Sequence, residues 1–84
     1  MTRFEQIIQK LYGMARIIQF MNDEDEIVFK VRNSIADIVP SHTLIYSNNG
    51  FIRYRIMDRV ESIDIDLNRV RVNYSSGFYL LIKG

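Results

Sequence analysis

The first 21 residues carry apolar side chains at the spacing of an amphipathic helix. Thr2 and Glu5 have the spacing of a capping box, in which a hydroxyl and a carboxylate satisfy free backbone N–H groups at a helix start. The apolar positions that follow the 3.6-residue period are Phe4, Ile7, Ile8, Leu11, Ala15, Ile18 and Met21. Further apolar residues widen this arc, so we expect a helix over residues 3–21 with neighbours on two sides.

A second helical pattern follows directly. Its apolar side chains are three and four residues apart, at Val28, Val31, Ile35 and Ile38. Asn22 precedes four acids at 23–26, where a helix dipole favours negative charge, and Pro40 ends the run. We therefore predict a helix over residues 23–38. The β-branched stretch IVFKV at 27–31 is also compatible with the start of a strand, because short apolar runs suit both structures.

From residue 43 onward, apolar and polar side chains alternate with a period of two, which is typical of half-buried strands. The turn-forming stretches SNNG, MDRV, NR and SSG divide this region. The five predicted strands lie at about 43–47, 51–57, 61–67, 70–74 and 78–83. Together the patterns predict a single α+β domain over residues 1–84, with two N-terminal helices packed on one face of a C-terminal antiparallel β-meander of about five strands.

The hairpin between the third and fourth predicted strands is internally consistent. With Asn68 and Arg69 as its loop, three apolar pairs share one face: Leu67 with Val70, Ile65 with Val72, and Ile63 with Tyr74. The same register sets Asp66 opposite Arg71 and Asp64 opposite Asn73. Alternation in the preceding strand places Ile52, Tyr54 and Ile56 toward the core and Phe51, Arg53 and Arg55 outward. We therefore expect the two aspartates to face Arg53, Arg55 and Arg71 as a solvated ladder of opposite charges.

The last predicted strand is apolar on both of its faces. Continued alternation places Tyr79 and Leu81 inward and leaves Phe78, Leu80 and Ile82 on the outer face. An exposed apolar strand promotes association. We expect a second copy of the chain to cover it in a homodimer, and the alternative is a barrel-like sheet that closes within one chain.

Composition narrows the class of protein. The chain has 48% hydrophobic and 25% charged residues, which is the range of ordinary globular domains. It has no cysteine, which excludes a disulfide framework and suits a reducing cytoplasm. It also lacks a long apolar run and the apolar core of a signal peptide, so we expect a cytoplasmic protein without membrane contact. Its thirteen isoleucines and six asparagines against two alanines resemble the residue usage of small accessory proteins of bacteriophages.

Few residues could carry catalysis. His42 is the single histidine and lies between Ser41 and Thr43, a stretch that does not by itself bring a nucleophile, a base and an orienting acid together. The stretch NDEDE at 22–26 lacks the ligand spacing, central glycine and final glutamate of a calcium loop. We expect no enzyme activity, no cofactor and no small-molecule substrate.

Two aspartates form the strongest candidate for a metal site. Asp64 and Asp66 are two residues apart on a predicted strand, so they share a face, and with Glu61 or Asp58 they could bind Mg²⁺ as in phosphoryl-transfer sites. The arginines expected opposite them favour a charge ladder instead. We therefore expect no metal, and a metal-dependent nuclease is the third hypothesis for the function.

Arginine-rich strands are the best functional lead. Eight of the eleven cations are arginine, which favours planar contacts, but a net charge of +1 means that nucleic-acid binding would need a local patch. The first hypothesis is a small non-catalytic regulatory protein, in the manner of a phage accessory factor, that inhibits or redirects a host macromolecule, most simply a protein. Its expected partner-binding or dimer face comprises Phe51, Arg53, Arg55, Arg71, Phe78, Leu80 and Ile82. The alternative is an RNA- or DNA-binding regulator, RNA before DNA, that uses Arg53, Arg55, Arg59, Arg69 and Arg71.

Overall fold

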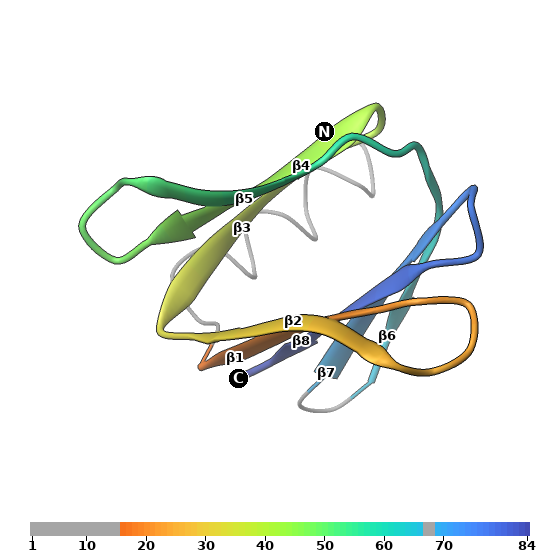
Figure 1. Ribbon diagram of the computed structural model, residues 1–84, viewed down its shortest axis with the longest axis horizontal. Coiled ribbons are helices and arrows are strands. Elements are labelled where there is room, and N and C mark those ends of the chain that lie inside the picture. The colour runs from red at the N-terminus through yellow and green to blue at the C-terminus, as the bar shows by residue number, and fades with distance from the viewer. Residues whose placement is uncertain (1–15, 67–68) are drawn as a thin grey trace.

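A computed structural model describes residues 16–66 and 69–84, and these residues form eight strands in two antiparallel sheets (Figure 1). The strands are β1 (Ile17–Met21), β2 (Ile27–Arg32), β3 (Ser34–Val39), β4 (His42–Ser47), β5 (Ile52–Ile56), β6 (Val60–Ile65), β7 (Arg69–Tyr74) and β8 (Tyr79–Lys83). The five-stranded sheet has the order β2-β1-β8-β7-β6, and the three-stranded sheet has the order β3-β4-β5. The described part of the chain is all-β, so the predicted α+β fold with two helices on one meander is wrong.

The core lies between the two sheets, which form two layers (Figure 1). Ile18, Val72 and Leu80 from the five-stranded sheet are completely buried, as are Ile38 and Ile45 from the three-stranded sheet. Each sheet thus has an apolar inner face and a more polar outer face, which is the arrangement that period-two alternation produces. Burial of these side chains is the main favourable contribution to folding.

The first predicted helix is replaced by β1 where the structure describes it, and residues 3–15 of that prediction lie outside the described residues. In β1, Ile18 and Phe20 are buried whereas Ile17 and Gln19 are half-buried, so the period is two. β1 is bonded to β2 on one side and to β8 on the other. Hydrogen bonds and packing from both neighbours outweigh the weak local preference for a helix.

The prediction of a helix over residues 23–38 is wrong, because Asn22 caps a hairpin turn and not the start of a helix. The Asn22 side-chain carbonyl accepts hydrogen bonds from the backbone N–H groups of Glu24, at 2.9 Å, and Glu26, at 2.8 Å. Asp25 has a positive φ of 61°, which a helix does not allow. An asparagine of this kind caps turns as well as helices. The four acids therefore lie in the turn between β1 and β2, and the alternative that IVFKV starts a strand is confirmed.

Asn33 forms the corner at which the chain passes from one sheet to the other. Its φ is 51°, in the left-handed region that asparagine tolerates better than most residues. Its backbone N–H donates to the carbonyl of Arg16 at 2.9 Å. β2 before it belongs to the five-stranded sheet and β3 after it to the three-stranded sheet.

Strands β4 to β8 lie within two residues of the five strands that the sequence predicts. They do not form one meander, because β4 and β5 join β3 whereas β6, β7 and β8 join β1 and β2. Arg53 and Arg55 on β5 are consequently in a different sheet from Asp64 on β6. The part of the predicted charge ladder that pairs the aspartates with Arg53 and Arg55 is wrong for this reason, whereas Asp64 is opposite the third predicted arginine, Arg71.

The register between β6 and β7 differs from the prediction by two residues. Ile65 is opposite Val70, and Asp64 is opposite Arg71. The turn is closed by the N–H of Asp66, which donates to the carbonyl of Arg69 at 2.8 Å. Because the shift is an even number, it preserves the predicted inner face of β7, with Val72 among its buried residues.

The side chains of β8 face the opposite sides of the sheet from those that the sequence predicts. Leu80 and Ile82 are 0% and 2% exposed and lie opposite Val72 and Val70 of β7. They belong to the core of this chain, so they cannot form an outer dimer face. β8 is the central strand of the five-stranded sheet, and the registers of its two neighbours decide which of its apolar faces turns inward.

Candidate functional site

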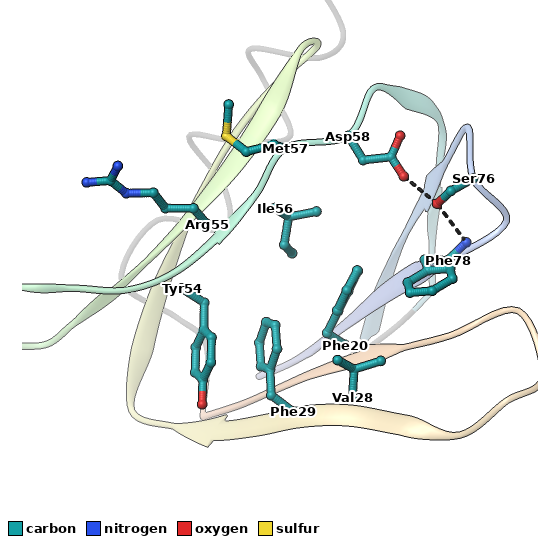
Figure 2. A pocket seen from close by; sticks show the side chains of 10 residues that line it. All are labelled: Phe20, Val28, Phe29, Tyr54, Arg55, Ile56, Met57, Asp58, Ser76 and Phe78. Atoms are coloured by element: carbon teal, nitrogen blue, oxygen red, sulfur yellow. Dashed lines mark hydrogen bonds between the residues drawn. The ribbon is translucent and has the colours of Figure 1, made fainter.

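A groove of about 660 Å³ opens along one side of the molecule, where the two sheets separate (Figure 2). Strand β2 borders it from the five-stranded sheet and β5 from the three-stranded sheet. The lining residues are Phe20, Val28, Phe29, Tyr54, Arg55, Ile56, Met57, Asp58, Ser76 and Phe78. Most of them are apolar, which is the usual composition of a binding groove.

A row of four aromatic rings forms one wall of this groove (Figure 2). Tyr54 of β5 stacks on Phe29 of β2 with ring centroids 3.9 Å apart and planes 2° apart. Phe29 is 5.3 Å from Phe20, which in turn is 5.5 Å from Phe78. Aromatic pairs of this kind contribute about 0.5–1.5 kcal/mol each beyond the area that they bury. The row connects the two sheets, so it provides a wall of defined shape.

Asp58 supplies the polar end of the groove. Its carboxylate accepts hydrogen bonds from the hydroxyls of Ser76 and Ser75, the latter at 2.7 Å, and from the backbone N–H of Arg59 at 2.8 Å. These bonds, led by those of Ser76 and Ser75, hold the pKa of Asp58 below its usual value of 3.8. Asp58 thereby fastens the turn between β7 and β8 to the segment between β5 and β6, which accounts for this carboxylate without a metal.

Several large apolar side chains are exposed on, or next to, the two strands that border the groove. Phe51 and Met57, which flank β5, are 73% and 76% exposed. Within β5 itself, Ile52 and Tyr54 are 44% and 41% exposed, contrary to the prediction that they face the core. Ile27 and Val28 of β2 are also exposed. Exposed apolar surface that is concentrated on neighbouring strands typically marks an interaction site.

Both strands that border the groove are edge strands. Among the described residues, β2 pairs only with β1, and β5 pairs only with β4. An open edge offers backbone N–H and C=O groups to a further strand. Residues 51–55 are all exposed, so β5 offers such an edge next to the aromatic wall.

No family model, curated protein or solved structure matches this chain. Its function is therefore inferred from the site. Within the described residues there is no helix that has both the length and the hydrophobicity of a membrane span. The cytoplasmic location stays a prediction.

The structure brings together part of the predicted partner face. Arg53 and Arg55 lie on β5, Phe51 directly precedes it, and Arg55 and Phe78 line the groove. Arg71 lies on the five-stranded sheet, where its guanidinium stacks on the ring of Tyr79. Leu80 and Ile82 are buried in the core, so two of the seven predicted residues, Arg55 and Phe78, line the groove.

The five arginines of the predicted nucleic-acid surface do not form one face. Arg53 and Arg55 are on β5, Arg59 precedes β6, and Arg69 and Arg71 are on β7 of the other sheet. The side chain of Arg53 lies 3.5 Å from the hydroxyl of Ser34. A nucleic-acid site built on all five arginines therefore does not fit the fold.

The residues considered for catalysis are dispersed. Asp64 accepts a hydrogen bond from the Asn73 amide at 2.9 Å, and the His42 ring lies 2.9 Å from the hydroxyl of Ser41. No group of three or more potential metal ligands occurs among residues 16–66 and 69–84.

Sequence reasoning missed the aromatic wall because it assigned Phe20 and Phe29 to helices. The signal that could have revealed it is the stretch IVFKVR at 27–32, in which apolar residues at 27, 29 and 31 alternate with Val28, Lys30 and Arg32. If this stretch is an edge strand, Phe29 lies on its core-facing side, together with Val31.

Proposed function

We propose that this protein is a small non-catalytic binding protein that captures an extended segment of a protein partner along the open edge of β5. In this proposal the segment adds a strand to the three-stranded sheet and places apolar side chains against the aromatic wall. The protein acts by direct contact, inhibiting or redirecting the macromolecule that it holds. The observation that carries the proposal is the run of exposed residues 51–55 on an edge strand beside an apolar groove.

The charge of β5 indicates what kind of segment fits. Arg53 and Arg55 are both exposed residues of β5. Arg53 is the bulged residue of the β4–β5 pairing, and a nitrogen of its guanidinium lies 3.5 Å from the hydroxyl of Ser34, whereas Arg55 is opposite Leu44. An added strand with acidic side chains would meet a cation at each of these two positions, and its apolar side chains would contact the aromatic wall. The favoured partner is thus an extended segment that contains both acidic and apolar residues.

A second copy of the same edge is a poorer match. Antiparallel pairing of two β5 strands about Arg53 or about Tyr54 sets arginine opposite arginine, and like charges opposite each other are destabilising. The homodimer that the sequence predicts stays a prediction, and light scattering at several protein concentrations would test it.

Synthetic peptides test the capture of an acidic segment. We compare peptides of about seven residues, the length of a typical strand, in which valine alternates with glutamate or with lysine. We expect the glutamate peptide to bind roughly tenfold more tightly than the lysine peptide, because its carboxylates pair with Arg53 and Arg55. A proline at the centre of the glutamate peptide should abolish binding, since it removes a backbone donor. Fluorescence anisotropy measures the affinities, and NMR chemical shifts locate the site.

Matched variants locate the effect. The double variant Arg53→Gln, Arg55→Gln should have a lower affinity for the glutamate peptide. The variant Arg69→Gln, on the other sheet, should leave that affinity unchanged. On binding of the glutamate peptide, NMR chemical-shift changes are expected at residues 51–57 and at Phe29. Equal binding of both charged peptides, or no binding at millimolar concentration, would contradict the proposal. Self-association that the β5 variant abolishes would assign the edge to a second copy instead.

A further inference from the structure

The outer face of the five-stranded sheet carries five cations in two rows across the strands, and we call it the cationic face. The members of the cationic face are Lys30, Arg32, Arg69, Arg71 and Lys83. The registers place Arg32, Ile17, Lys83 and Arg69 side by side in the first row. The second row runs through Lys30, Gln19, Leu81 and Arg71.

The direction of these side chains follows from their neighbours. Val31, Ile18, Ile82 and Val70 form the register row between the two cationic rows, and all four are buried in the core. Successive residues of a strand point to opposite faces of a sheet. The cationic rows therefore face away from the core.

Cations outnumber acids on the outer face of this sheet. The first row contains three cations and lies at the Ile17 end of β1, and Asp66 borders it on the β6 side, opposite Arg69. The acidic turn 23–26 follows the other end of β1. Asp64 on β6 borders the second row, opposite Arg71, and accepts a hydrogen bond from the Asn73 side-chain amide at 2.9 Å. A protein with a net charge of +1 thus presents a local positive field on one half of one sheet.

Arg71 is held in a defined orientation. Its guanidinium carbon lies 3.9 Å from the centre of the Tyr79 ring, and its Nε donates to the Asn73 side-chain carbonyl at 2.7 Å. Tyr79 is anchored in turn, because its hydroxyl donates to Asp25 at 2.5 Å. A planar, stacked guanidinium loses less freedom on binding than a mobile side chain and offers a flat surface for a base.

We propose that the cationic face binds the phosphate backbone of single-stranded nucleic acid. Three strand spacings separate β2 from β7, so the first row spans about 14 Å, and the second row lies about 7 Å away. Sheets that bind single strands combine such a positive track with stacking groups, and stacked Arg71 supplies the stacking group here. A membrane surface is a poorer match, because the aliphatic residues between the cations, Ile17 and Leu81, are half-buried and cannot insert.

A salt titration tests this proposal. The probes are mixed-sequence single-stranded RNA and DNA of about 20 nucleotides, longer than the roughly 4–16 nucleotides that one small domain covers. Each neutralised phosphate contributes about 0.7 to the slope of log affinity against log salt, so five contacts give a slope of at most about 3.5. A triple variant that combines Arg32→Gln, Arg69→Gln and Lys83→Gln should lower that slope by about 2, because it removes three phosphate contacts. Arg32 and Arg69 are exposed and Lys83 is half-buried on the outer face, so circular dichroism should show an unchanged fold.

The matched control uses the same substitution on the other sheet. Arg53→Gln with Arg55→Gln should leave the slope unchanged, and this variant separates the cationic face from the β5 edge. The proposal is overturned by no binding at about 50 mM salt, by tighter binding of duplex DNA, or by a slope that only the β5 variant lowers. Binding of anionic lipid vesicles without binding of nucleic acid would also overturn it.

Discussion

One hydrogen bond joins the two sheets through the centre of the core. The hydroxyl of Tyr74 on β7 donates to the Thr43 hydroxyl on β4 at 2.7 Å, and both side chains are buried. Every buried side-chain nitrogen or oxygen of the described residues has a partner, so this pair is part of a fully satisfied core. Removal of one hydroxyl would leave the other buried without a partner, which costs about 1–3 kcal/mol.

Alkaline pH should destabilise the fold through Tyr74. Burial, opposed by the hydrogen bond with Thr43, raises the pKa of Tyr74 from 10.0 to about 12. The folded state therefore keeps this proton to higher pH than the unfolded state does. The contribution of this proton to the free energy of unfolding is fully present below about pH 10. It is lost as the pH rises toward 12, which lowers the free energy of unfolding by roughly 3 kcal/mol if Tyr74 alone is responsible. Urea denaturation at a series of pH values measures this slope.

Phenylalanine variants separate Tyr74 from its neighbour. Tyr74→Phe should flatten the stability profile above pH 10. The pKa of Tyr79 is also raised, mainly because its hydroxyl donates to Asp25, so Tyr79→Phe is the control and should leave most of the slope in place. An unchanged slope in Tyr74→Phe would contradict the buried position of that hydroxyl.

At the scale of the element, the corner at Asn33 makes a two-layer fold possible. β2 and β3 are separated by this one residue, yet they belong to different sheets. The left-handed backbone at Asn33 turns the chain abruptly, and its N–H is bonded to the carbonyl of Arg16. The corner thereby sets β2 along one border of the groove while β3 starts the opposite layer.

The residue type at this corner should matter more than its side-chain contacts. Asn33→Val should destabilise the protein by about 1–3 kcal/mol, because a β-branched residue is strained at positive φ. Asn33→Gly should be nearly neutral, since glycine adopts this conformation freely. Thermal and urea unfolding measure both effects, and equal stability of the two variants would show that the corner does not need a left-handed residue.

At the scale of the whole molecule, packing and charge divide the surface into regions with different roles. The inner faces of both sheets are used for the core, and the remaining apolar surface is concentrated around β5 and the groove. The positive charge is concentrated on the outer face of the other sheet. The arginines of the β5 edge and the cations of the cationic face lie on different sheets, so substitutions in one set should not affect binding at the other.

The position of Leu80 distinguishes a core residue from an interface residue. Leu80 is completely buried opposite Val72, so Leu80→Asp should unfold the chain rather than release a folded monomer. The milder Leu80→Ala should cost about 2–5 kcal/mol by removing core contacts. Circular dichroism and NMR would report unfolding. A folded monomer of Leu80→Asp would instead support the outer position that alternation in the sequence predicts.

The sequence predicted β4 to β8 well because period-two alternation is a local property of a strand. The helical predictions failed because local signals were ambiguous. The apolar spacing from Val28 to Ile38 suits a helix, yet it also occurs across two strands joined at Asn33. Likewise, Asn22 can cap a helix or close a hairpin turn, and only the following strand pairing decides between them.

The candidate site was predictable only in part. Phe51, Arg53, Arg55 and Phe78 were identified from the sequence, since exposed arginine and aromatic residues on a strand are visible as a pattern. The aromatic wall was not, because Phe29 and Tyr54 are 25 residues apart and meet only when the two sheets pack. The cationic face was hidden for the same reason, as Lys30, Arg32 and Lys83 become neighbours only through the strand order.

By itself, the sequence determined the positions and periods of the C-terminal strands, the turn residues between them and the absence of cysteine chemistry. Tertiary structure alone decided that the strands form two sheets, that Leu80 rather than Tyr79 faces the core, and which charges share a face. The physical reason is that alternation defines two faces for each strand but not which one is buried. That choice depends on hydrogen bonds and apolar contacts between segments far apart in the chain.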